Sequence, residues 1–480
     1  MGISLNPSTL LSGQGLDVSS LVTQLLSQKS GQVTTWQNEQ TTFQLQAGAL
    51  QSINSDLSAL ATAVTALSDP LGALTAQVAT SSDTSVLTAT ATTSAPAGQH
   101  NIVVSNLATQ GLIYADAIAG GANVSILPQG QTTGDLKLQI GGAGGTSADI
   151  QITAGSNDTL ATLASSINSL STTNHWGITA SVVSDATGAR LSIVSQATGT
   201  PGALAITTNT TSLNFNAPVG GTNASLTVDG TPYQYTSNAI PAGAIPGVTL
   251  NLASAAPNST VQVTVGPDVQ QATDAINTFV SAYNKVITDI NQQFAVNPAT
   301  DSQGPLGSDS ALRSLQTNLM ADITYSVSGN SGLVNLAALG INMNDDGTLT
   351  AGTTPSGQTL SQVLTANPAA FQNFFQNASS TGFANQFHTS LTNLTDPTLG
   401  LLNVDLAQNK TMQQSVADNI NNFETQLTAQ QNQLTKQLSQ VNATLQSYPL
   451  LLQQVTETLA TMGSGSTTSS SSHPTLTSGL

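Results

Sequence analysis

Apolar residues recur every seven positions near the start of the chain, which is the spacing of a coiled-coil seam. The first series is Trp36, Phe43, Leu50, Leu57, Val64 and Leu71. An interleaved series, Ile53, Leu60, Leu67 and Leu74, follows three residues behind members of the first. We expect a long helix that begins at an N-cap among Asp17, Ser19 and Ser20 and ends near Ser68, ahead of Asp69-Pro70.

A second seam closes the chain, with apolar positions that step by four and three except across Gln430 and Gln431. Its members are Val416, Ile420, Phe423, Leu427, Leu434, Leu438, Val441, Leu445, Tyr448, Leu452, Val455, Leu459 and Met462. Because each stripe is too narrow for a buried globular helix and too long to stay exposed, we expect the terminal helices to pack against each other or against neighbouring subunits. The two glutamines form a tolerated polar layer or, alternatively, set the register or loosen the helix.

Between the seams the period changes from helical to alternating, which predicts short strands separated by Gly, Pro, Asn and Asp turns. The expected strands include residues 136–140, 150–153, 178–183, 191–194, 226–228 and 261–265, with one helix from Asn157 to Ser169. Helical periodicity resumes at Val269, and another helix is expected from about Ser308.

This order of elements predicts an α+β multidomain fold, in which a terminal α-helical coiled-coil stem carries an inserted β-rich head of two small domains. The expected division is a flexible N-terminal segment (1–35), an N-terminal stem helix (36–78), a proximal head domain (79–110 with 219–267), a distal head domain (111–218), a helical stem and leg domain (268–440), a C-terminal coiled-coil helix (441–462) and a disordered Ser-rich tail (463–480).

Composition argues against several classes of function. Charged residues make up only 6% of the chain, and the formal net charge of -17 disfavours binding to nucleic acid or to anionic membranes. No cysteine is present, which excludes disulfides, thiol nucleophiles and cysteine-based metal sites. Residues 1–30 do not resemble a cleaved signal peptide, and no apolar run approaches the roughly 20 residues of a membrane span, so we expect no membrane insertion.

Residue patterns that carry chemistry are missing from the sequence. The histidines are scattered, and no nucleophile elbow or Walker loop occurs. Gly141 to Gly145 is interpreted as a hairpin turn. Asn342 to Gly347 resembles the start of a calcium loop, but Thr353 stands where a glutamate is needed, so a turn between strands is favoured. Phe371, Phe374 and Phe375 are interpreted as a core helix face. We therefore expect no enzyme activity, cofactor or metal.

Several stretches together resemble one family, the flagellar filament-capping proteins, also called hook-associated protein 2. Residues 13–22 (GQGLDVSSLV) are similar to its N-terminal signature, with Gln14 in place of the usual small residue. Residues 304–313 (GPLGSDSALR) resemble its helix-opening motif, and 339–342 (LGIN) with 346–349 (DGTL) its hairpin. Residues 279–285 (FVSAYNK) and 245–250 (IPGVTL) are similar to its stem helix and to a strand of its head. Residues 159–168, 178–182 and 188–191 resemble a repeat shared by flagellin-like insertions.

The resemblance implies a secreted, extracellular protein that self-assembles into a homo-oligomeric cap at the distal tip of the bacterial flagellum. Such a cap promotes folding and insertion of exported flagellin and is required for filament elongation and motility. It implies assembly or partner contacts at Leu16, Val18, Leu21 and Val22, and at Leu438, Val441 and Leu445, the last three as a docking face for a type III export chaperone.

Other classes of protein fit the residues less well. A cysteine-free β-rich surface or phage-tail adhesin, with a role in cell adhesion, is the alternative, although it would not need two helical seams. A hydrolase would need a catalytic constellation. Flagellin or a junction protein would share the helical ends but not the motifs at 304–313 and 339–349.

Overall fold

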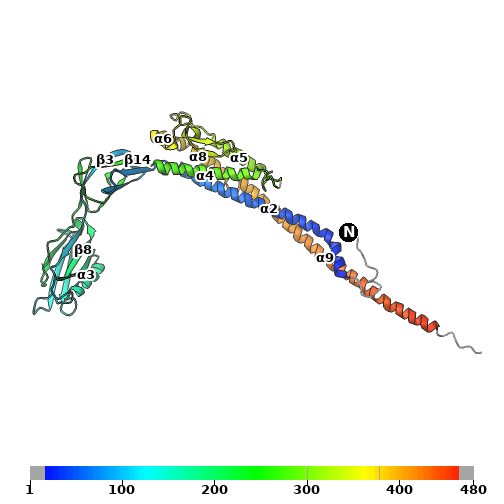
Figure 1. Ribbon diagram of the computed structural model, residues 1–480, viewed down its shortest axis with the longest axis horizontal. Coiled ribbons are helices and arrows are strands. Elements are labelled where there is room, and N and C mark those ends of the chain that lie inside the picture. The colour runs from blue at the N-terminus through cyan, green and yellow to red at the C-terminus, as the bar shows by residue number, and fades with distance from the viewer. Residues whose placement is uncertain (1–16, 300, 378, 464–480) are drawn as a thin grey trace, which may run out of the picture.

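A computed structural model describes residues 17–299, 301–377 and 379–463. The molecule is a long, bent rod in which a helical stem carries two β-rich bodies at one end, and the C-terminal helix extends beyond the other end (Figure 1). The α+β architecture expected from the alternation of helical and strand patterns is confirmed.

Two long helices form the backbone of the stem. Helix α2 (Val18–Ser68) begins where Asp17 accepts a hydrogen bond from the backbone N–H of Ser20, and it ends before Asp69-Pro70 as expected. The side-chain amide of Gln376 donates to the carbonyls of Leu67 and Asp69, which satisfies part of this helix end. Helix α9 (Leu401–Gly463) is continuous through Pro449, and no break separates residues 401–440 from 441–462.

Shorter elements pack against the half of the stem that lies nearer the β-rich bodies (Figure 1). They are α4 (Val269–Phe294), α5 (Ser310–Ile323), the 3-10 helix η2 (Leu336–Leu339), the hairpin β15 (Ile341–Met343) and β16 (Leu349–Ala351), α6 (Leu360–Ala366), α7 (Pro368–Phe375) and α8 (Phe383–Leu394). The helices expected from Val269 and near Ser308 are confirmed, as are the turn at Asp345-Asp346-Gly347 and the buried Phe371, Phe374 and Phe375.

The heptad positions of α2 do not share one environment. Leu50, Leu57 and Val64 are at most 2% exposed and belong to a core that also includes residues of α4, α5, α7 and α8. The expectation that the stripe was too narrow for a globular core is therefore wrong over this half. Leu71 is also wrongly placed in the seam, because it lies in the turn after α2 and is 74% exposed.

The proximal head consists of two antiparallel sheets that enclose their own core. One has the order β1 (Gln77–Ser81), β14 (Val261–Pro267), β3 (Gly98–Asn106), β10 (Ala224–Val228) and β11 (Thr231–Tyr235). The other has the order β12 (Ala239–Ile245), β13 (Val248–Leu252) and β2 (Leu87–Ala91). Only β1 and β14 lead from this body into the stem, where the backbone N–H of Asp268 bonds to the carbonyl of Ala76.

The distal head has two further antiparallel sheets and one helix around a separate core. The first sheet has the order β4 (Gln110–Tyr114), β8 (Gly188–Thr198) and β7 (Ile178–Asp185). The second has the order β6 (Thr146–Thr153), β5 (Thr133–Ile140) and β9 (Leu204–Asn209), and the 3-10 turn η1 (Thr200–Gly202) precedes β9. Residues 141–145 form the turn between β5 and β6 as expected. Helix α3 (Leu160–Asn174) begins three residues later than expected, because Thr159 rather than an earlier residue forms its capping box.

Each buried cluster of the described residues thus draws on a different part of the chain, and we propose that the three clusters mark the domains. Residues 18–35 are already helical and continuous with the rest of α2, so a boundary at residue 35 does not coincide with a break in structure. The Ser-rich tail at 464–480 lies outside the described residues.

Candidate assembly interface at the free end of the stem

Between the globular core and the end of the stem away from the heads, α2 and α9 run side by side in opposite directions (Figure 1). The ring of Trp36 meets that of Phe423 edge-on, with centroids 5.4 Å apart. The side-chain amide of Asn409 donates to Oε1 of Gln46 at 3.2 Å, and Nζ of Lys29 donates to Oε1 of Gln430 at 2.8 Å. The two terminal seams therefore pair with each other over this half of the stem, as one of the two sequence-based alternatives proposed.

The polar interruption of the seam has a structural counterpart. Gln430 makes the hydrogen bond to Lys29, which favours a role in holding the register of the two helices. Next to it lies a groove of about 480 Å³ between the helices, lined by Leu26, Leu427 and Gln431 among others. The two helices therefore leave a surface groove between their side chains at this level.

The assembly residues expected near the start of the chain lie at the beginning of α2, except Leu16, which lies outside the described residues. Val22 is 1% exposed, and Val18 and Leu21 are half-buried. In residue count along the antiparallel pair, Leu21 and Leu438 lie equally far, eight residues, beyond the Lys29–Gln430 contact.

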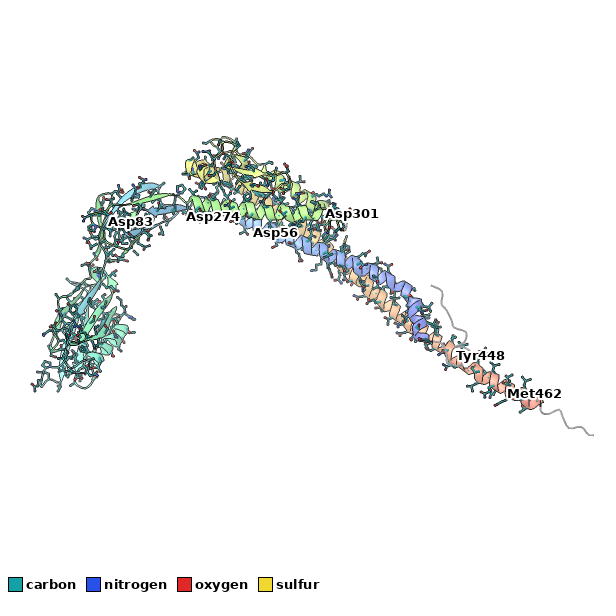
Figure 2. All side chains as sticks on the ribbon, in the orientation of Figure 1. Asp56, Asp83, Asp274, Asp301, Tyr448 and Met462 are labelled. Carbon is teal, nitrogen blue, oxygen red and sulfur yellow. The ribbon has the colours of Figure 1, made fainter. Side chains whose placement is uncertain are left out.

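The expected C-terminal contact residues lie toward the end of α9. Leu438 and Leu445 are half-buried, and Val441 is 49% exposed. Farther along, α9 has no other described helix beside it, and Tyr448 and Met462 are labelled on this protruding part in Figure 2.

This protruding part of α9 is strongly apolar for an exposed helix. Its large apolar residues are between 51% and 76% exposed; they are Tyr448, Leu450, Leu451, Leu452, Val455, Leu459 and Met462, hereafter the α9 extension. The heptad spacing had picked out five of them. Leu450 and Leu451 were missed because they do not keep the four-three spacing, although three consecutive leucines are a visible signal in the sequence.

An ion cluster fixes α2 to α4 in the middle of the stem. Nζ of Lys285 lies 3.2 Å from Oδ2 of Asp56 and 2.5 Å from Oδ2 of Asp289. Burial, together with the neighbouring Asp289, raises the pKa of Asp56, and the contact with Asp289 followed by that with Asp56 raises the pKa of Lys285. The cluster joins helices rather than forming a reactive site, since its cation is paired on both sides.

Among the described residues, no three or more His, Asp or Glu side chains gather where they could hold a metal ion. In the same part of the chain, no helix combines the length and apolar character needed to cross a membrane.

Comparison with known proteins identifies relatives over nearly the whole chain. Residues 14–111 match the family described as Flagellar hook-associated protein 2 N-terminus, and residues 221–449 match Flagellar hook-associated protein 2 C-terminus. The B-type flagellar hook-associated protein 2 of Pseudomonas aeruginosa is 28% identical over 474 residues, covering 91% of this chain and 94% of that protein. The flagellar hook-associated protein 2 of Escherichia coli K12 is 28% identical, covering 70% of this chain and 73% of its own.

A solved structure shows the same arrangement. The crystal structure of the flagellar cap protein FliD D1-D2-D3 domains from Escherichia coli superposes with a TM-score of 0.55 at 26% sequence identity. The match covers 75% of this chain and 99% of the solved one.

Proposed function

This chain belongs to the flagellar hook-associated protein 2 family, the structural proteins that cap the flagellar filament, and we propose how its shape serves that position. The single observation that carries the proposal is the separation of its two ends. A β-rich head with few charged residues lies at one end of a helical stem, and an apolar part of α9 with no other described helix beside it lies at the other (Figure 1). The comparisons give no support to the surface or phage-tail adhesin considered as the alternative.

In the proposed mechanism the stem end engages the filament and the heads lie outermost. The α9 extension and the start of α2, including Val18, Leu21 and Val22, contact neighbouring copies or the filament, because an exposed apolar stripe is stabilised by burial against another helix. The heads of several copies together cover the tip. Exported flagellin then folds and inserts beneath this cover, and each insertion displaces the cap by one step.

This proposal is tested by substituting the α9 extension in the full-length chain. Leu452→Ser with Leu459→Ser removes two exposed seam positions, and Gln453→Ser with Ala460→Ser is the matched control at adjacent positions. In a strain that lacks the wild-type protein, we expect the first pair to give short or absent filaments and unpolymerised flagellin in the medium. The control should restore normal filaments.

Immunoblots of the medium establish that both variants are exported, so the comparison concerns assembly alone. Normal filament length with the Leu452 and Leu459 variant would refute the role of the extension.

We also propose that the segment around Leu438, Val441 and Leu445 binds a type III export chaperone in the cytoplasm before secretion. An amphipathic helix of this kind fits an apolar groove, and the side chain of Val441 is 49% exposed on α9. Replacing the three residues with Ser should abolish capture of the chaperone. The control, Gln437→Ser with Gln440→Ser and Gln446→Ser, should bind normally, and equal binding by both variants would place the chaperone elsewhere.

A further inference from the structure

Each three-stranded sheet of the distal head has two edge strands, and β7 and β6 are the longer edge strand of their respective sheets. In the described structure β6 pairs only with β5, and β7 pairs only with β8. Both strands are eight residues long, and both ladders run without a register shift. Long, regular edges of this kind add strands from other chains unless something prevents it. A protein that assembles with many copies of itself brings such edges close together.

Side chains from α3 occupy half of the β7 edge. The amide of Asn168 donates to the carbonyl of Ala180 at 2.8 Å and accepts from the N–H of the same residue at 2.7 Å. The hydroxyl of Ser171, which is 6% exposed, pairs in the same way with the carbonyl and the N–H of Ile178, at 2.7 and 3.1 Å. These two side chains take the positions that the backbone of an added strand would take.

The edge of β6 is occupied by one side chain in the same manner. The amide of Asn157 donates to the carbonyl of Gln151 and accepts from the N–H of Thr153, both at 2.8 Å. Asn157 lies in the loop between β6 and α3. The segment that connects β6 to β7, which includes α3, therefore supplies the side chains that cover both edges.

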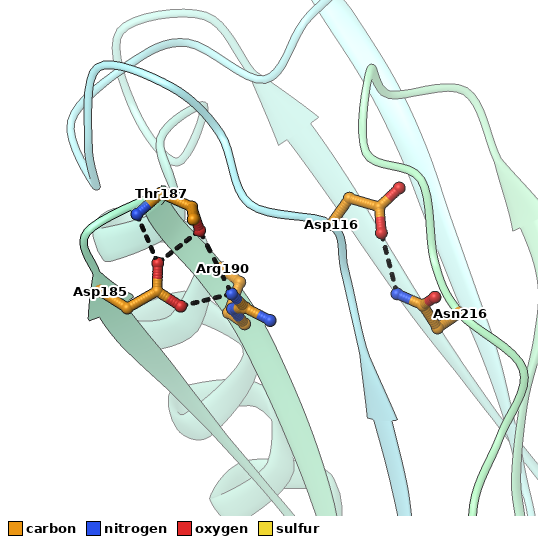
Figure 3. Close-up of polar contacts among 5 residues, drawn as sticks. All are labelled: Asp116, Asp185, Thr187, Arg190 and Asn216. Carbon is orange, nitrogen blue, oxygen red and sulfur yellow. Dashed lines mark hydrogen bonds and ion pairs between the residues drawn. The ribbon is translucent and has the colours of Figure 1, made fainter.

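Charged pairs mark the remaining parts of the two edges. At the far end of β7, the carboxylate of Asp185 pairs with Arg190 and accepts from the N–H of Thr187 at 2.8 Å (Figure 3). On β6, Oδ2 of Asp149 lies 2.8 Å from Nζ of Lys137. Charges on an edge strand oppose pairing with another strand, because the added strand would have to desolvate them.

We propose that Asn157, Asn168 and Ser171 are edge-blocking residues, which stop a strand from a second copy of this chain from adding to β6 or β7. They hold the outward-facing backbone groups in hydrogen bonds that a partner strand would need. Strand pairing between heads through β6 or β7 is thereby opposed, and the crowded heads of an assembly stay separate at these two edges.

The test opens the β7 edge in the full chain with Asn168→Ala plus Ser171→Ala. Hydrogen exchange should quicken at least about tenfold at the amides of Ile178 and Ala180 in dilute solution. Sedimentation velocity over a concentration series should then show a new associated species above the wild-type distribution, and the same amides should become protected again as it forms.

A third substitution, Val182→Pro, distinguishes strand addition from other association. The N–H of Val182 points outward, because it lies two residues beyond Ala180 on an alternating strand. Proline there removes no bond to β8 but blocks an incoming strand. We expect it to return the sedimentation profile to that of the wild type.

Leu163→Ala is the matched control, since it weakens the core of the same helix and leaves the edge-blocking residues in place. Asn157→Ala tests the β6 edge independently, because Asn157 lies outside the helix and the strands. Three outcomes would overturn the proposal: fast exchange at the opened edges without association, association that survives Val182→Pro, or equal association by Leu163→Ala.

Discussion

Leu57 on α2 offers the most direct test of the stem core. Its side chain is 0% exposed, in a cluster with residues of α4 and α8. Leu57→Ala removes three carbons, which costs roughly 2.4 kcal/mol of transfer free energy at about 0.8 kcal/mol each. The cavity left in a rigid multi-helix core adds to this, so we expect a loss of about 3 to 5 kcal/mol in the free energy of unfolding of the stem domain.

Leu45→Ala is the matched control, because Leu45 lies on the same helix but is 59% exposed. It should change the free energy of unfolding by no more than about 0.5 kcal/mol. For a domain of this size, the Leu57 variant should lower the Tm of the stem transition by roughly 6 to 20 °C, and the control by at most about 2 °C.

Scanning calorimetry measures these shifts, and hydrogen exchange assigns them to parts of the molecule. Amides of α4 should lose protection in the Leu57 variant, whereas those of β5 and β8 should not change, because the distal head has a separate core. Equal shifts for both leucines, or a lower Tm of the head, would refute the placement of Leu57 in the stem core.

Three further predictions concern other parts of the chain. A double-mutant cycle with Trp36→Ala and Phe423→Ala, followed by urea unfolding, should give a coupling of about 0.5 to 1.5 kcal/mol, and zero coupling would mean that the terminal seams do not pair there. Burial raises the pKa of Asp322, so the ionised carboxylate lowers the stability of the folded protein at neutral pH. Asp322→Asn should therefore raise the Tm at neutral pH, and this gain should disappear as the pH falls below the ordinary pKa of 3.8. A gain that does not depend on pH would contradict the reasoning. Gly221→Ala should lower the Tm of the head more than Gly142→Ala does. Both glycines have a positive φ, +67° and +73°, but a Cβ at residue 221 would lie 2.5 Å from a backbone atom of Ala203, which leads into β9, whereas residue 142 faces open space. Equal changes in Tm would show that the close approach carries no cost.

Spacing along the chain was sufficient to place most elements, because helix and strand periods and their end signals are local. The heptad leucines located α2, Asp17 and Asp69-Pro70 marked its ends, and the β-branched runs located the strands of both head bodies. The motifs at residues 13–22, 304–313 and 339–349 are sufficient to indicate the family without knowledge of the tertiary structure.

The partners of these elements were decided only by the tertiary structure. Leu57 lies in a globular core, whereas Trp36, in the same heptad series, packs only in the pair of α2 and α9. The reason is that α4 packs only against the half of α2 nearer the heads. Leu71 keeps the seven-residue spacing but is exposed, since the chain has already left the helix. Periodicity describes one segment at a time, whereas burial depends on which distant segment comes to lie against it, and this is also why the bonds from Asn168 to β7 could not be foreseen from the sequence.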